Sequence, residues 1–247
     1  MRRFGTVLAM TLLAGVTFLA SPAAAAPRDA ADLADDCNAD GRLDISGTMR
    51  FRRGAGTLTT DCVVTMAAGS RLVLKDLTLT STDSFFVIGQ AANDTEVRVI
   101  RSTIDLGDAL QLAPGCCSGE ETIPEDNADI VVRDSFLRAT SVEVSASTAS
   151  FDGRVRVRRS TLIATVTSTA VRGSETADVV VSDTDLSAVT SLFIQSGIDG
   201  RTRVVRSTLA GGEIDISTGP GGTCRSARNT PNVPCAATTA PAPVPEP

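Results

Sequence analysis

The chain has 247 residues, with 23 lysines and arginines against 29 aspartates and glutamates, and a formal net charge of −6 at pH 7. It contains no histidine, tyrosine or tryptophan, so general acid–base catalysis near neutral pH would have to use Asp, Glu, Lys or Arg. The acidic net charge argues against nucleic acid and anionic membrane surfaces as partners, because both select basic patches.

The first 26 residues have the pattern of a secretory signal peptide. Arg2 and Arg3 precede an apolar run at residues 7–20, and the small residues of "SPAAAAP" follow it. The apolar run is shorter than the ~20 residues that a membrane span needs, so we expect no membrane insertion after cleavage. Removal of residues 1–26 leaves one expected domain, residues 27–235, in a protein secreted to the periplasm or the extracellular space.

Six cysteines, an even number in a chain with an export signal, predict disulfide bonds, although the sequence does not define their pairing. Their positions at the two ends of the domain favour Cys37–Cys62 and Cys224–Cys235. The vicinal Cys116 and Cys117 are interpreted as part of an ordinary loop-stiffening disulfide, with a strained vicinal bond or a soft-metal site as the alternative. Because a metal site needs further Cys or His ligands nearby, we expect no metal, and we expect no cofactor.

Six segments of eight residues align without gaps on a terminal Leu or Ile, at 72–79, 97–104, 130–137, 155–162, 179–186 and 202–209. Their ends are 25, 33, 25, 24 and 23 residues apart. A period in this range indicates stacked repeats, in which each unit buries its apolar face on its neighbours. The third position is always apolar and the first is apolar in five segments, which predicts a strand with one buried face.

A second apolar alternation follows each segment, at Phe86 and Ile88, Leu110 and Leu112, Val142 and Val144, Leu192 and Ile194, Ile214 and Ile216, and more weakly near Val171. Two or three short strands in such a turn leave no room for a helix and can stack in parallel only as a β-solenoid. The recurring pattern V-x-V-x-[RD]-[ST]-x-[LI] resembles the right-handed parallel β-helix superfamily, the pectate-lyase-like fold of many secreted bacterial proteins. The predicted fold class is therefore all-β, a right-handed parallel β-helix of about seven coils with 23–25 residues per coil.

The residue three before each terminal Leu or Ile alternates in sign along the repeats: Asp76, Arg101, Asp134, Arg159, Asp183 and Arg206. In-register parallel strands would place these residues about 4.8 Å apart in one column, with opposite charges facing at every step. We predict a structural charge ladder that fixes the register. The next residue is Ser or Thr in five of the six segments, which predicts a column of hydroxyl groups that bond one another at a corner.

Two regions are expected to lie outside the regular coils. The 33-residue interval contains an insertion rich in Gly, Pro and acidic residues, predicted as a loop at residues 114–129. The Pro- and Ala-rich residues 236–247 predict a disordered tail.

The sequence allows two functions. The polygalacturonases of the superfamily use Asp with His, which is missing here, and the pectate lyases need acidic calcium ligands that converge, whereas Asp and Arg alternate in this chain. We therefore assign no catalytic residue and predict a non-enzymatic scaffold or adhesion module that binds a polysaccharide or an envelope or surface protein. The alternative is a lyase-like enzyme that acts on acidic polysaccharide. The candidate ligand-binding residues are Arg98, Arg101, Arg156, Arg159, Arg203 and the outward-facing Phe136.

Overall fold

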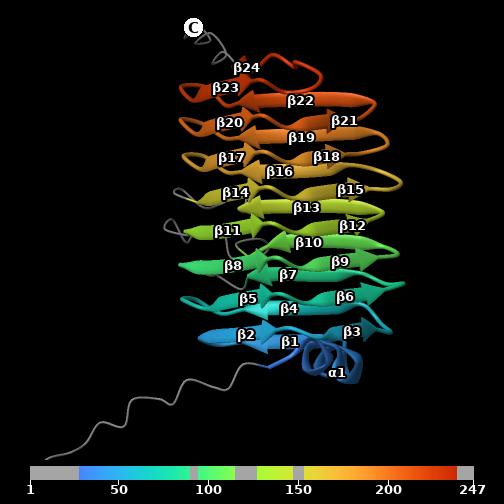
Figure 1. Ribbon diagram of the computed structural model, residues 1–247. Helices are drawn as coiled ribbons and strands as arrows, with labels where there is room; N and C mark the ends of the chain where they lie inside the picture. Colours follow the sequence, from blue (N-terminus) through green and yellow to red (C-terminus); the bar gives the residue numbers. More distant parts are fainter. Residues whose placement is uncertain (1–27, 90–93, 115–126, 147–152, 238–247) are drawn as a thin grey trace, which may run out of the picture.

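The computed structural model describes residues 28–89, 94–114, 127–146 and 153–237. The chain passes through one strand of each of three sheets and then begins the next turn one level along the axis (Figure 1). Neighbouring strands in all three sheets are parallel and in register. This arrangement confirms the prediction of a β-solenoid of about seven turns. No helix in these ranges is long and apolar enough to cross a membrane.

Each sheet takes every third strand of the chain as far as β23, and the last strand, β24, joins the nine-stranded sheet. The nine-stranded sheet contains β1 (Arg42–Ile45), β4 (Cys62–Met66), β7 (Phe85–Gly89), β10 (Ala109–Ala113), β13 (Ser141–Ala146), β16 (Thr169–Gly173), β19 (Ser191–Ser196), β22 (Glu213–Thr218) and β24 (Ala236–Ala237). The eight-stranded sheet contains β2 (Thr48–Arg52), β5 (Arg71–Lys75), β8 (Thr95–Ile100), β11 (Ala128–Arg133), β14 (Arg154–Arg158), β17 (Asp178–Ser182), β20 (Arg201–Val205) and β23 (Thr223–Ala227). The seven-stranded sheet contains β3 (Ala55–Leu58), β6 (Thr78–Ser81), β9 (Thr103–Leu106), β12 (Phe136–Ala139), β15 (Thr161–Ala164), β18 (Asp185–Ser187) and β21 (Thr208–Ala210).

Alternate residues of the strands point into one core that runs along the axis. The third position of the repeated segment is buried in all six segments: Leu74, Val99, Val132, Val157, Val181 and Val204. Val132 pairs in register with Val99 in the preceding coil and with Val157 in the following one. Each such side chain contributes about 1.5–3 kcal/mol by its burial, so the stacked columns hold the coils together.

The second alternation is shifted by one residue in the coil of β7. Phe86 and Ile88 were expected to face the core, but the register pairs Leu110 with Phe85 and Leu112 with Val87. Phe85 and Val87 are accordingly fully buried. The prediction was wrong here because four consecutive residues of β7 are apolar, and a two-residue period does not then define the inward face.

A helix that the repeat pattern did not predict, α1 (Ala30–Asp40), covers the N-terminal end of the solenoid (Figure 1). Its start is a capping box, in which Asp29 accepts hydrogen bonds from the first turn and Asp32 accepts from the Asp29 backbone. The helix buries an apolar stripe that includes Leu33. Gly56 of β3 permits this contact, because a Cβ atom there would lie 2.1 Å from the Ala30 carbonyl oxygen.

The two ends of the solenoid each carry a disulfide bond. Cys37 in α1 is bonded to Cys62 in β4, and Cys224 in β23 is bonded to Cys235, as the positions of these cysteines favoured. Cys116 and Cys117, the predicted signal peptide and residues 238–247 of the predicted tail lie outside the described residues. The predicted tail begins too early, because Ala236 and Ala237 form β24 and pair with β22. The predicted loop at 114–129 extends too far, because β11 begins at Ala128 and Asp129 is therefore a strand residue.

The predicted column of hydroxyl groups lies at the buried corner between the eight-stranded and seven-stranded sheets. Each hydroxyl donates to the carbonyl oxygen two residues earlier, as Ser135 does to Arg133 at 2.8 Å. Most of these hydroxyls also accept from a backbone N–H of the preceding coil, as Ser135 does from Ser102 at 3.2 Å. The hydroxyls were expected to bond one another, but the neighbouring partner is this buried N–H group, which would otherwise lack an acceptor.

Replacement of Ser135 by alanine tests this role. In Ser135→Ala the Ser102 N–H loses its acceptor in a buried corner, which should lower the free energy of unfolding by about 1–3 kcal/mol. Chemical denaturation measures the change. Ser135→Thr is the control, because Thr184 occupies the equivalent position and makes the same kind of bond to the carbonyl oxygen of Ser182. Unchanged stability in the alanine variant would show that the hydroxyl column is dispensable.

Candidate functional site

Each coil bends sharply at the residue that follows the eight-stranded sheet. The backbone is left-handed at eight successive positions of this corner, with φ between 46° and 67°: Arg53, Asp76, Arg101, Asp134, Arg159, Asp183, Arg206 and Arg228. Asparagine and aspartate are among the L-residues that adopt this conformation most readily, whereas arginine has no such preference. The ion pairs of its side chain, and not its backbone preference, therefore explain arginine at positions 101, 159 and 206.

Six of these eight corner residues form three ion pairs. The pairs are Arg101 with Asp76, Arg159 with Asp134 and Arg206 with Asp183, each with two N–O hydrogen bonds of 2.6–2.9 Å. The ladder was expected to pair at every step. Within the described residues no ion pair joins Arg101 to Asp134 or Arg159 to Asp183, so direct contact occurs at alternate steps only.

The ion pairs shift the titration of both partners. The hydrogen bond from Arg159 lowers the pKa of Asp134 below its ordinary value, and the same contact raises the pKa of Arg159. A carboxyl group with a lowered pKa in the folded state stabilises the fold above the pKa of the unfolded chain. That contribution is lost as the pH falls through the lower pKa of the folded state. The ladder therefore favours the fold at neutral pH and loses this effect in acid.

Replacement of Asp134 by asparagine should weaken the pH dependence of stability. Asparagine keeps the left-handed backbone preference but not the charge, so Asp134→Asn should melt at a lower temperature than the unaltered protein at neutral pH. The difference should shrink as the pH falls below about 4, where the unfolded carboxyl group becomes protonated. Thermal melts followed by circular dichroism across this range measure it. Asp185→Asn, at an exposed carboxylate with no ion pair within the described ranges, is the control, and parallel curves for the two variants would contradict the assignment.

The positive charges of the chain are concentrated on one side of the solenoid. Of the 23 lysines and arginines in the sequence, 17 are described residues that lie on the outer side of the eight-stranded sheet or at the corner that follows it, together with six carboxylates. We call this surface the basic face. Its cations are Arg50, Arg52, Arg53, Arg71, Lys75, Arg98, Arg101, Arg133, Arg154, Arg156, Arg158, Arg159, Arg201, Arg203, Arg206, Arg225 and Arg228, and its carboxylates are Asp76, Glu96, Asp129, Asp134, Asp178 and Asp183.

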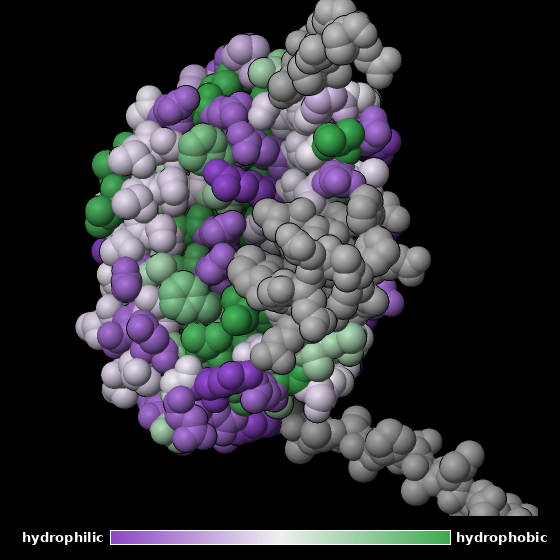
Figure 2. Space-filling view, turned by 180° about the vertical axis from the view of Figure 1, so that it is seen from behind, coloured by the Kyte–Doolittle hydropathy of each residue, from purple (hydrophilic) through white to green (hydrophobic). Residues whose placement is uncertain are grey.

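The charges of the protein are unevenly distributed over its surface. Its surplus of 11 positive charges stands on a protein whose formal net charge is −6, because the other 23 acidic residues lie elsewhere in the chain. Seen from behind the view of Figure 1, hydrophilic side chains run up the middle of the molecule with hydrophobic ones between them (Figure 2). The acidic net charge therefore does not exclude an anionic partner at this face.

Five of the six candidate ligand-binding residues lie on the basic face. Arg98 is bound to Glu96, which also contacts Arg71, and Arg101 and Arg159 belong to the corner pairs. Arg156 and Arg203 have no ion pair within the described residues. The sixth candidate, Phe136, is half-buried on the seven-stranded sheet between Thr103 and Thr161. The structure therefore does not place Phe136 with the arginines.

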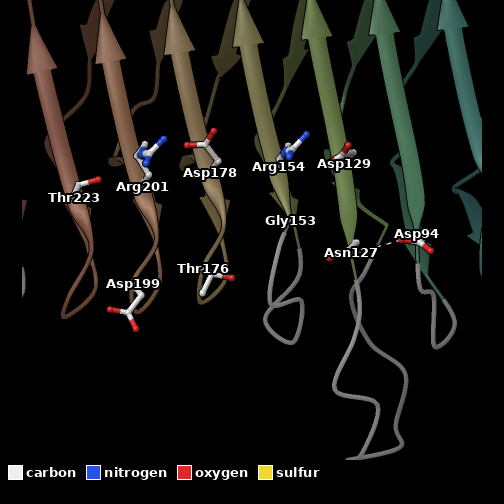
Figure 3. A pocket seen from close by; sticks show the side chains of 10 residues that line it. All are labelled: Asp94, Asn127, Asp129, Gly153, Arg154, Thr176, Asp178, Asp199, Arg201 and Thr223. Atoms are coloured by element: carbon white, nitrogen blue, oxygen red, sulfur yellow. Dashed lines mark hydrogen bonds between the residues drawn. The ribbon is translucent and has the colours of Figure 1, made fainter.

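A groove follows the edge of the basic face where the strands of the eight-stranded sheet begin (Figure 3). It has a volume of about 730 Å³ and is lined by Asp94, Asn127, Asp129, Gly153, Arg154, Thr176, Asp178, Asp199, Arg201 and Thr223. Asp129, Arg154, Asp178 and Arg201 stand in register on four neighbouring strands, so acidic and basic groups alternate along it (Figure 3). This groove was not predicted from the sequence, although the residues before the last four repeated segments, which alternate in sign, were a signal for it.

Burial distinguishes two carboxylates of the groove. Partial burial raises the pKa of Asp129, even though the positive charge of Arg154 opposes that shift. Asp178 has one buried carboxylate oxygen, Oδ1, that has no hydrogen-bond partner among the described residues. Within the described residues, no group of three or more His, Cys, Asp or Glu residues is arranged to hold a metal ion. The chemistry available in the groove is therefore that of isolated carboxyl groups between guanidinium groups.

Known proteins do not assign a function to this arrangement. No protein-family model, curated protein sequence or solved structure matches the chain.

Proposed function

We propose that the protein is an exported, non-enzymatic binding module of the pectate-lyase-like, right-handed β-helix type, which binds an acidic polysaccharide along its basic face. The observation that carries the proposal is the surplus of 11 positive charges on one side of an acidic protein. The signal-like N-terminus and the two disulfide bonds support an oxidising compartment outside the cytoplasm.

The spacing of the arginines favours a polymer over a small ligand. Arg98, Arg156 and Arg203 stand on every second strand, about 10 Å apart along the axis, with valines between them. An exposed contact between one guanidinium and one carboxylate contributes only about 0–1 kcal/mol, so a single sugar acid would bind weakly. A chain with a charge on each repeating unit would make many such contacts at once, and the combined affinity would be high.

Retention on immobilised polysaccharides tests the proposal. The protein should be retained by a carboxylated polysaccharide and not by a neutral one, and rising salt should release it because exposed charges are screened. The double variant Arg98→Gln/Arg156→Gln should elute at clearly lower salt. Arg42→Gln/Arg138→Gln, with the same change of net charge but on other surfaces, is the matched control. Equal elution of the two double variants, or no retention of the unaltered protein, would refute the proposed function.

One observation favours an enzyme as the second candidate. Asp129 lies in the groove beside the basic face, and its raised pKa lets this carboxyl group hold a proton at a higher pH than an ordinary aspartate. A protonated carboxyl group can act as a general acid towards a glycosidic oxygen, with Asp178 as the nearby carboxylate. Such an enzyme would cleave the polymer that the arginines hold.

Product analysis in the same samples tests the second candidate. Cleavage would release reducing ends or unsaturated sugars from the acidic polysaccharide, and Asp129→Asn should abolish this release while retention stays as in the unaltered protein. Asp199→Asn, at an exposed carboxylate of the same groove, is the control and should leave the release in place. Retention without any released product would support the binding module and count against the enzyme.

A further inference from the structure

A shallow pocket lies within the basic face, between two strands that are rich in arginine. The strand β17 runs between β14 and β20, and its outward residues in this region are small, Val180 and Ser182. The flanking strands and corners carry long guanidinium side chains, so a trough forms over β17. The pocket has a volume of about 300 Å³ and is lined by Arg158, Arg159, Val180, Ser182, Asp183, Arg203, Val205 and Arg206.

Two of the four arginines in this pocket are already paired. Arg206 binds Asp183 with N–O distances of 2.6 and 2.8 Å. Arg159 binds Asp134 of the preceding coil with distances of 2.6 and 2.9 Å. These contacts hold the two guanidinium groups at the corner column, on one side of the trough. They also neutralise the carboxylate of Asp183, the acidic residue that lines the pocket.

The other two arginines contribute about two positive charges that no carboxylate of the pocket neutralises. Arg158 on β14 and Arg203 on β20 have no ion pair within the described ranges. They stand on opposite sides of β17, on strands about 10 Å apart, so their side chains can reach one group above Val180 and Ser182. The Ser182 hydroxyl on the floor has no hydrogen-bond partner among the described residues and can donate to such a group.

We infer that this trough is a binding pocket for a phosphate group, carried by a phosphate monoester or present as the free ion. A phosphate monoester has a charge of about −1.5 to −2 at neutral pH and three acceptor oxygens, which match two unpaired guanidinium groups and a hydroxyl. The oxygens of a tetrahedral group point in different directions, so it accepts from both walls of the trough. A carboxylate has one negative charge and acceptors in a single plane, and suits the fork of one arginine.

The pocket is a local site, distinct from the extended binding of a polymer. The proposed polysaccharide contact needs many weak interactions along the basic face, whereas the phosphate group needs the three residues that surround one point of β17. The pocket could hold a phosphorylated sugar of a polymer, a soluble phosphate ester or a lipid headgroup, because all three present the same group. Its existence does not depend on the proposed polysaccharide function.

Isothermal titration of the purified protein with inorganic phosphate at low salt tests the pocket. Phosphate should bind more tightly than acetate, and Arg158→Gln and Arg203→Gln should each weaken it by about ten-fold or more, since each removes a charged hydrogen-bond donor. Arg50→Gln is the matched control. Arg50 belongs to the same outward column as Arg203 and is an exposed residue of β2, but it lies outside the pocket. This variant should bind phosphate within about two-fold of the unaltered protein, as expected for an exposed arginine elsewhere on the face.

Three results would overturn the inference: no binding of phosphate, binding of acetate as tight as that of phosphate, or an equal loss in Arg50→Gln. Melting temperatures of the variants establish that they are folded. Glucose 6-phosphate and phosphatidylcholine vesicles with phosphatidic acid then distinguish the source of the group, and binding of either should be lost with Arg158→Gln and Arg203→Gln. These variants leave Arg98 and Arg156 in place, so failure of the phosphate pocket would leave the polysaccharide test unaffected.

Discussion

In-register stacking of parallel strands is the constraint on which the rest of this structure depends. Each residue lies beside the residue at the equivalent position of the next coil, about 4.8 Å away, so the side chains at each position of the repeat form a column. Buried valines and leucines gain from this repetition, because like shapes pack well on each other. Buried hydroxyls gain too, since Ser135 reaches the backbone N–H of the coil before it. Charged residues do not, because like charges in neighbouring positions repel, and the corner column from Asp76 to Arg206 alternates in sign.

The protein meets this constraint with a unit of two coils. At the corner, Asp134 and Arg159 form one bidentate pair, and the next pair begins with Asp183. In the strand column from Val73 to Arg203, valines separate successive arginines, so these like charges stand two strands apart, whereas Arg203 and Arg225 are direct neighbours. Strand β14 has more outward positive charge than this alternation requires, because Arg154, Arg156 and Arg158 all point outward from it. The register of the coils does not require these three arginines. They fit the proposed binding of an anionic ligand.

Periodicity predicted the parts of the fold that repeat. The apolar alternation around Val99 and Val157 predicted the strands, their parallel direction and their register. A single register places all of these side chains in one buried column. It failed at Phe86, where four apolar residues in succession hide the inward face. It could not predict α1, which occurs once, although Asp29 and Asp32 marked a helix start. Only part of the candidate site could be predicted from the sequence. Arg98 and Arg203 occupy the same position in repeated strands, which the period reveals. The groove also includes Asp94 and Asp199, which lie outside the strands and do not follow the period.

In the described part of the chain, the separation of charge between the basic face and the remaining surface corresponds to an electric dipole across the solenoid axis. A polyanion attracts one side of such a molecule and repels the other, so the torque acts at a distance of a Debye length, before any contact forms. The protein would therefore approach a polyanion with its basic face oriented towards it. Molecules adsorbed side by side on such a matrix would all expose the same acidic surface to the solvent.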